Sequence, residues 1–166
     1  MSLLPMVILI MGVAGSGKTT VGRELAAALG WPFADADDFH SAANIAKMSA
    51  GEPLDDADRA PWLAALRAFI DARLACGENA VLACSALKAA YRDQLIAGRG
   101  GIKPVLLHGA RELLRTRLAG RAGHYMKPAM LDSQLAAFEP PATALILDIR
   151  HPPAELVAEI RAAFRV

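Results

Sequence analysis

Eight consecutive residues have the types and the spacing needed to hold a phosphate chain. Residues 12–19 read Gly-Val-Ala-Gly-Ser-Gly-Lys-Thr and satisfy the phosphate-loop pattern G-x-x-x-x-G-K-[ST]. Glycines let successive backbone N–H groups face a phosphate, Lys18 supplies a mobile cation, and Thr19 offers a hydroxyl to Mg²⁺. An apolar run precedes the segment and a helical pattern follows it, as this motif requires. The predicted nucleoside triphosphate site comprises Gly12, Val13, Ala14, Gly15, Ser16, Gly17, Lys18, Thr19 and Thr20.

Two carboxylates follow the second strand-like segment. Asp35 and Asp37 alternate along an extended stretch, so both side chains would lie on one side of it. We predict that Asp35 and Thr19 serve the metal and that Asp37 accepts a hydrogen bond from an attacking hydroxyl. A carboxylate is roughly ten pKa units less basic than an alkoxide, so Asp37 would mainly orient the hydroxyl. An acidic, solvated turn is the alternative interpretation.

Polar groups after the third strand-like segment are candidates to bind a polar substrate. Ser85, Lys88 and Arg92 occupy this region, where many phosphate-loop proteins carry an acidic metal ligand and this sequence has none. A solvated helix face is the alternative for Lys88 and Arg92. His40 and His124 are further candidate substrate contacts, because phosphoryl transfer does not require a histidine base.

The basic segment that begins at Arg117 is typical of a closing lid. Arg117 and Arg121 are four residues apart, and glycines lie close by. Arginines placed over a triphosphate would neutralise charge in the transition state and exclude water. Both are therefore predicted to contact the nucleotide. An ordinary basic surface helix is the alternative.

Length and charge restrict the class of protein. At 166 residues the chain suits one α/β domain. Eighteen basic and 17 acidic residues leave a formal net charge of +1, so no general attraction to nucleic acid or membrane is expected. Of the two cysteines, Cys84 ends an apolar strand pattern, which suits a small buried thiol better than a disulfide framework. The first apolar run is too short to span a membrane. We therefore expect a soluble, cytoplasmic protein.

The order of apolar runs predicts a doubly wound sheet. Strand-like segments occur at 7–11, around Phe33, and at 80–84, 104–107 and 144–147, with helical patterns between most of them. The clearest helix is expected to begin after Asp58, with Pro61 in its first turn, and to end before Gly77. Two polar stretches, 35–58 and 119–130, interrupt this rhythm and are predicted to be functional insertions.

These motifs together resemble the gluconate kinase family of small phosphate-loop kinases. The resemblance spans nearly the whole chain. Besides the phosphate loop, it rests on Asp-Ala-Asp-Asp-Phe-His at 35–40, Asp-Arg-Ala-Pro-Trp at 58–62, Cys-Ser-Ala-Leu-Lys at 84–88, Tyr-Arg at 91–92, Arg-Ala-Gly-His-Tyr at 121–125 and Ser-Gln at 133–134. It implies ATP-dependent, Mg²⁺-assisted phosphorylation of D-gluconate at its 6-hydroxyl.

The resemblance also implies a fold and a distribution of roles. The fold is one kinase domain over 1–166, a three-layer α/β/α structure with a five-stranded parallel sheet of order 2-3-1-4-5. A helical insertion at about 38–60 binds substrate in this fold, and a lid lies at about 117–131. Bacterial members are usually homodimers. The implied catalytic residues are Lys18, Asp37 and Arg121. The implied substrate contacts are Asp37, His40, Arg59, Ser85, Lys88, Arg92 and His124.

Other functions remain open at the level of sequence. Shikimate kinase is the nearest alternative, although its triple-glycine substrate loop is not evident, and a nucleoside monophosphate kinase is less well matched. A GTPase-like switch would need the guanine-reading N-K-x-D motif, which is absent. A catalytically inactive ATP-sensing module would not need Lys18, Thr19 and Asp37 together. A substrate panel separates these alternatives.

Overall fold

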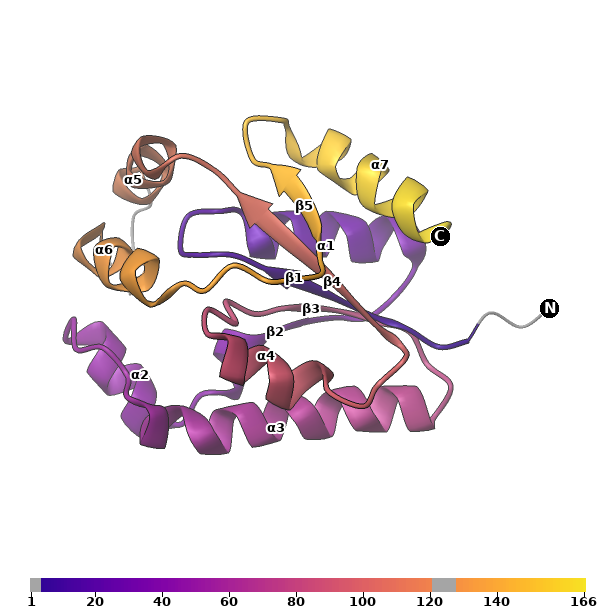
Figure 1. Cartoon of the computed structure of the whole chain (residues 1–166), viewed down its shortest axis with the longest axis horizontal. Coiled ribbons are helices and arrows are strands. Elements are labelled where there is room, and N and C mark those ends of the chain that lie inside the picture. Colours follow the sequence, from indigo (N-terminus) through magenta and orange to yellow (C-terminus); the bar gives the residue numbers. More distant parts are fainter. Residues whose placement is uncertain (1–3, 121–127) are drawn as a thin grey trace.

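Five parallel strands form the centre of the molecule. The computed structural model describes residues 4–120 and 128–166. Its sheet has the order β2-β3-β1-β4-β5 and confirms the predicted order (Figure 1). The strands are β1 (Val7–Met11), β2 (Phe33–Asp35), β3 (Ala80–Ala83), β4 (Ile102–His108) and β5 (Leu145–Asp148). All five end at the edge of the sheet where the phosphate loop begins, which is where ligands gather in this architecture.

Helices cover both faces of the sheet. In Figure 1, α1 and α7 lie on one face and α3 and α4 on the other, while α2, α5 and α6 stand at the carboxyl ends of the strands. The helices are α1 (Lys18–Leu29), α2 (Ala42–Ser49), α3 (Asp56–Ala75), α4 (Ala89–Ile96), α5 (Arg111–Ala119), α6 (Pro128–Ala137) and α7 (Pro153–Phe164), with a 3₁₀ turn, η1, at Ala36–Phe39. These layers match the predicted three-layer arrangement.

The central strand supplies both hydrophobic cores. Ile8 and Ile10 pack with residues of α1 and α7, whereas Val7, Leu9 and Met11 pack with residues of α3. Every residue of β1 is therefore buried, which explains why its sequence is an unbroken apolar run rather than an alternating one. Because the side chains of β1 are packed into both cores, a shift of this strand would disrupt the packing of both, which holds the start of the following loop in place.

Helix α3 begins earlier than the sequence indicated. The prediction placed its start after Asp58 with Pro61 in the first turn, but the helix begins at Asp56 and Pro61 lies inside it. Asp55 accepts a hydrogen bond from the Asp58 N–H, and the Asp58 carboxylate accepts one from the Asp55 N–H. This reciprocal cap stabilises the earlier start. The predicted end is confirmed, since the helix stops at Ala75, before Gly77.

The predicted insertion at 38–60 is tied to α3 through polar contacts. Buried Asn44 in α2 donates from Nδ2 to the carbonyl of Asp58 over 2.9 Å. Lys47 forms an ion pair with the Asp58 carboxylate over 2.9 Å. These contacts hold α2 against the first turn of α3, so the insertion forms one wall beside the ends of the strands.

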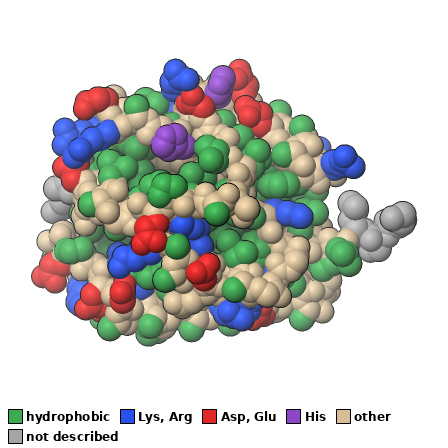
Figure 2. Space-filling view, in the orientation of Figure 1, with side chains coloured by type: hydrophobic (Ala, Val, Ile, Leu, Met, Phe, Trp, Pro, Cys, Tyr) green, Lys and Arg blue, Asp and Glu red, His purple; other side chains and the backbone are tan. Residues whose placement is uncertain are grey.

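The surface carries charges of both signs. On the face shown in Figure 2, basic and acidic side chains are interspersed rather than separated into two fields. This distribution agrees with the small net charge of the sequence. Within the residues that the structure describes, no helix combines the length and the apolar character needed to cross a bilayer.

Candidate active site

The phosphate loop depends on a close approach at its first glycine. Gly12 has φ +150, and a Cβ placed there would lie 2.6 Å from Ser16 Oγ and 2.8 Å from the carbonyl oxygen of Leu107. Only glycine leaves room for this packing. The loop then passes into α1 through Gly17, whose φ is +93. Lys18 and Thr19, the first residues of α1, line the pocket beside the loop, so the helix N-terminus, a favourable place for an anion, lies there.

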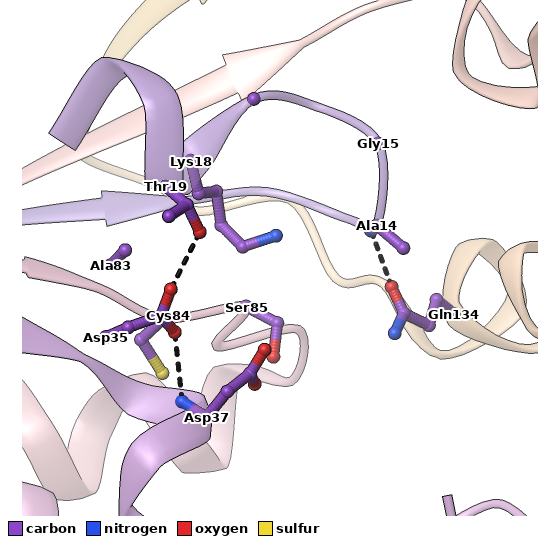
Figure 3. A pocket seen from close by; sticks show the side chains of 11 residues that line it. Ala14, Gly15, Lys18, Thr19, Asp35, Asp37, Ala83, Cys84, Ser85 and Gln134 are labelled. Carbon is purple, nitrogen blue, oxygen red and sulfur yellow. Dashed lines mark hydrogen bonds between the residues drawn. The ribbon is translucent and has the colours of Figure 1, made fainter. Parts of the chain in front are cut away.

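The residues predicted for the metal lie next to each other. Thr19 donates from Oγ1 to Asp35 Oδ2 over 2.7 Å, and Asp35 Oδ1 accepts the Asp37 N–H over 3.0 Å (Figure 3). Asp35 therefore joins the start of α1 to η1, on which Asp37 is carried. Hydroxyl and carboxylate oxygens are the ligands that Mg²⁺ prefers, so this pair fits that ion. Lys18 lies beside them and donates from Nζ to the Val13 carbonyl over 3.2 Å.

Two adjoining pockets divide the site. The first, here the phosphate pocket, lies along the phosphate loop and contains Lys18, Thr19 and Asp35. The second, here the acceptor pocket, contains Arg59 and Lys88 and is walled by α2, α3 and α6. Its lining residues are Asp37, His40, Met48, Pro53, Leu54, Arg59, Trp62, Ser85, Leu87, Lys88, Met130, Ser133, Gln134 and Ala137.

The two pockets meet at three polar side chains. Asp37, Ser85 and Gln134 line both of them. These residues come from η1, from the segment after β3 and from α6, and Figure 3 shows them around one opening. A group bound in the acceptor pocket would therefore reach the phosphate pocket past these three side chains. This is the arrangement that direct transfer between two bound molecules requires.

Two cations, Arg59 and Lys88, line the acceptor pocket. Arg59 donates to the Leu54 carbonyl over 2.5 Å and to Tyr91 Oη over 3.3 Å. Lys88 pairs with Asp56 over 3.1 Å, and Tyr91 donates to the same carboxylate. The hydrogen bonds from Tyr91 and Lys88 lower the pKa of Asp56. Two cations held around one tyrosine ring offer partners for an acidic substrate.

His40 is held as a packed, neutral group. Its ring stacks on Trp62 with centroids 4.5 Å apart and an interplanar angle of 10°. The Nδ1 atom of His40 lies 3.3 Å from Asn44 Nδ2, and Trp62 donates from Nε1 to the Ala36 carbonyl over 2.7 Å. Partial burial lowers the pKa of His40 below its ordinary value, with the neighbouring Asp37 acting in the opposite direction. The neutral ring can accept a hydrogen bond from a substrate hydroxyl at one nitrogen or donate one to it from the other.

The Cys84 thiol beside the site is a poor nucleophile. Cys84 follows β3, lines the phosphate pocket and is buried. Burial raises its pKa to about 12. Since only the thiolate is a good nucleophile, Cys84 acts as a small packing group at neutral pH. Its neighbour Ser85 is the polar residue that this segment contributes to both pockets.

Arg92 and Arg117, both predicted to bind a substrate, line neither the phosphate pocket nor the acceptor pocket. Arg92 is buried and donates to the carbonyls of Ala86 and Leu87 over 2.9 and 3.0 Å, so it supports the segment after β3 instead of lining the acceptor pocket. Its predicted contact with substrate therefore has no geometrical support. Arg117 donates to the Ile149 carbonyl over 2.6 Å.

A third pocket lies on the other side of the phosphate loop. Arg117 lines it together with Gly15, Ser16, Gly17 and Thr20. Its position suits the nucleoside part of a nucleotide whose phosphates follow the loop. Of the predicted lid, Arg121 and His124 lie outside the described residues.

Sequence reasoning did not select Gln134 for the site. Its Oε1 accepts the Ala14 N–H over 2.7 Å, and its side chain lines both the phosphate and acceptor pockets. The available signal was the pair Ser133-Gln134, which contributed to the family resemblance without being given a role. An uncharged amide 120 positions from the loop has no local motif that would mark it.

Comparison with known proteins identifies the family. A gluconokinase from Gluconobacter oxydans is 47% identical over 141 residues, covering 85% of this chain and 79% of that protein. The thermosensitive gluconokinase of Escherichia coli is 41% identical over 159 residues, covering 93% and 85%. The chain belongs to the gluconokinase family. A crystal structure of a gluconokinase from Sinorhizobium meliloti has 43% identity and a TM-score of 0.85, covering 96% of this chain and 91% of that one. Residues 7–141 also match the family described as AAA domain.

We predict that His40 makes the free energy of unfolding decrease as the pH falls below about 6.5. Because its pKa in the folded chain lies below the unfolded value of about 6.5, the unfolded chain binds the proton more readily. Stability is therefore complete above that value and falls as pH drops through the folded pKa. Urea unfolding of His40→Gln should show a smaller loss between pH 7.5 and pH 5 than the parent chain. Equal losses in both proteins would contradict this assignment.

Proposed function

We propose that this chain transfers the γ-phosphoryl group of ATP to the 6-hydroxyl of D-gluconate, giving 6-phosphogluconate and ADP. The observation that supports it is the junction of the phosphate pocket and the acceptor pocket at Asp37 and Ser85. The phosphate loop would hold the donor on one side of this junction. Arg59 and Lys88 would bind the carboxylate of the acid on the other.

Asp37 is the proposed partner of the attacking hydroxyl. It lines both pockets, and its own N–H is held by Asp35. A carboxylate is too weak a base to ionise an alcohol before reaction, so its first role is to accept a hydrogen bond and aim the oxygen. In a loose transition state the hydroxyl becomes acidic as its bond to phosphorus forms, and Asp37 can then accept the proton.

Charge on the transferred group would be balanced by the phosphate loop. Lys18 and the loop amides face the region where that charge develops, and their preorganisation lowers the barrier. Thr19 and Asp35 would hold Mg²⁺, which when bound supplies positive charge to the phosphate oxygens. The participation of Arg117 and Arg121 in a lid remains a prediction from the sequence.

The acceptor pocket would select an acid that carries several hydroxyl groups. Arg59 and Lys88 are the proposed carboxylate partners, while His40 and Ser85 offer hydrogen bonds to hydroxyls nearer Asp37. Trp62, Leu54 and Leu87 contribute apolar surface beside them. The homodimer and the cytoplasmic location remain predictions based on the family resemblance and the composition.

An acceptor panel tests the proposed function. ADP formation with ATP and Mg²⁺ should depend strongly on D-gluconate and should stay close to the acceptor-free blank with shikimate or nucleoside monophosphates. Omission of Mg²⁺ should abolish the gluconate-dependent signal. Faster turnover with shikimate or a monophosphate would reject gluconate as the substrate, and ATP binding without any turnover would favour a nucleotide sensor.

Replacement of Asp37 should affect the chemical step. We expect Asp37→Asn to lower kcat with gluconate at least about a hundredfold, because the amide cannot accept the proton and aligns the hydroxyl poorly. Asp38→Asn is the matched control, since Asp38 is exposed, adjacent in sequence and absent from the lining of both pockets. Steady-state kinetics with unfolding curves for both variants provide the measurement. A kcat close to that of the control would remove Asp37 from this role.

Replacement of Arg59 should affect acceptor binding. We expect Arg59→Ala to raise the KM for gluconate about tenfold or more, with a smaller change in the KM for ATP, because a charge-assisted contact is lost. Arg67→Ala is the control, since Arg67 lies on the same helix and donates instead to the Gln94 carbonyl. Initial rates over a grid of both substrates separate the two constants. A selective increase in the KM for ATP would place Arg59 at the nucleotide instead.

A further inference from the structure

The side-chain amide of Asn44 contacts two groups beside the acceptor pocket. Its Nδ2 atom lies 2.9 Å from the carbonyl oxygen of Asp58 and 3.3 Å from Nδ1 of His40. Asn44 is buried within α2. If the amide were turned over, its oxygen would face the Asp58 carbonyl oxygen, and two acceptors at that distance repel each other. The contact with Asp58 therefore identifies the Asn44 atom next to His40 as the nitrogen.

This contact determines which nitrogen of His40 carries the hydrogen. An amide nitrogen has two hydrogens and donates only; one hydrogen of Asn44 Nδ2 serves the Asp58 carbonyl, and the other faces His40. His40 Nδ1 must then be the acceptor and carry no hydrogen. In the neutral ring the hydrogen therefore lies on Nε2. Any form with a hydrogen on Nδ1 would place two hydrogens against each other.

Stacking and hydrogen bonding orient the His40 ring in different ways. Trp62 sets the plane of the ring, since the two rings stack at 4.5 Å with an angle of 10°, and the indole is itself anchored to the Ala36 carbonyl over 2.7 Å. A half-turn of the imidazole within the stack would keep this plane and exchange Nδ1 for a carbon. The contact with Asn44 distinguishes the two orientations, so it also determines where Nε2 lies.

The Nε2 atom of His40 is the ring nitrogen left for a ligand. His40 lines the acceptor pocket. Among the residues that the structure describes, Nε2 has no hydrogen-bond partner. Burial lowers the pKa of His40, Asp37 opposes this and Arg59 adds to it, so the ring is neutral at pH 7. In this tautomer Nε2 has an N–H and no free lone pair, so it can only donate.

We propose that Asn44 is a positioning residue that keeps His40 in its Nε2–H form, so that His40 donates a hydrogen bond to an oxygen of the acid sugar. The identity of that sugar rests on the proposed function. Because Nε2 already carries a hydrogen, His40 cannot take the proton of the attacking hydroxyl, and that step stays with Asp37. Asn44 thus assigns the two neighbouring polar groups opposite roles, His40 as donor and Asp37 as acceptor.

Nitrogen NMR of the histidine rings measures the tautomer in the unmodified protein. Bare and protonated ring nitrogens have well separated ¹⁵N shifts, and the signals lost in His40→Gln identify His40 among the four histidines. At a pH well above the His40 pKa found in the same spectra, Nε2 should be protonated and Nδ1 bare. The opposite pattern, or shifts averaged between the two forms, would overturn the proposal.

Asn44→Asp should reverse the tautomer, because a carboxylate accepts where the amide donated. The hydrogen should move to Nδ1, and the KM for gluconate should rise at least about fivefold more than the KM for ATP, with one hydrogen bond lost. Lys47→Met is the matched control. Lys47 lies on the same helix, pairs with Asp58 over 2.9 Å, and its replacement also makes the net charge more negative by one.

The control separates positioning from a merely structural role. Lys47→Met weakens the same link between α2 and α3 but should keep the ring shifts of His40 and the KM for gluconate of the parent chain. An equal rise in KM in both variants, or unchanged ring shifts in Asn44→Asp, would overturn the role of Asn44. If Asn44→Asp does not fold, the spectrum of the parent chain still decides the tautomer.

Two replacements of His40 test the donated hydrogen bond itself. His40→Gln keeps an amide N–H near the position of Nε2 and should hold the KM for gluconate within about threefold of the parent value, whereas His40→Met should raise it at least about fivefold. A parent-like KM in His40→Met would overturn the proposal. Absence of gluconate turnover in the parent chain would instead reject the proposed function, and the ring spectra would still decide whether Asn44 sets the tautomer.

Discussion

The site depends on how closely β4 and the end of the phosphate loop approach Gly12. The carbonyl of Leu107 and the hydroxyl of Ser16 occupy the space that any side chain at this position would need. Because β1 pairs with β4 on one side and β3 on the other, a shift in the β1–β4 register would move Leu107 and open the loop. The two hydrophobic cores hold that register, since β1 contributes to both of them. Core packing therefore determines the geometry of the amides that face phosphate.

A second set of contacts places the acceptor side of the reaction. Asp37 is exposed, and its position comes from the backbone of η1, which Asp35 caps and which Trp62 holds through the Ala36 carbonyl. The same indole stacks on His40, so Trp62 of α3 helps to place Asp37 at the junction and His40 in the acceptor pocket. Thr19 contacts Asp35 from the start of α1. Donor and acceptor sites thus share one rigid connection, which favours transfer between bound partners over transfer to water.

Local sequence signals predicted the parts of the site that local structure creates. The apolar run of β1, the phosphate-loop pattern and the alternation of Asp35 and Asp37 each depend on residues close in sequence, whereas the strand order came from the family resemblance. The start of α3 was missed because two competing signals occur there, Pro61 and the Asp55–Asp58 cap, and the reciprocal hydrogen bonds stabilise the earlier one. The sequence identifies Arg92 as a cation but cannot show that its side chain turns toward two carbonyls. Tertiary structure alone brings Gln134 to the loop.

The two pockets differ in formal charge, so each would bind its substrate through different groups. The charged side chains lining the phosphate pocket are Lys18, Asp35 and Asp37, with a formal sum of −1. A triphosphate would meet net repulsion there, so loop amides and a divalent cation must supply the attraction. The acceptor pocket instead contains Arg59 and Lys88 against Asp37, a formal sum of +1, with His40 neutral. Asp56 already pairs with Lys88, so Arg59 is the cation that a single carboxylate would meet without displacing another carboxylate. A phosphorylated sugar would bring two further negative charges to the same place, so electrostatics favours the acid before phosphorylation and assists release of the product afterwards.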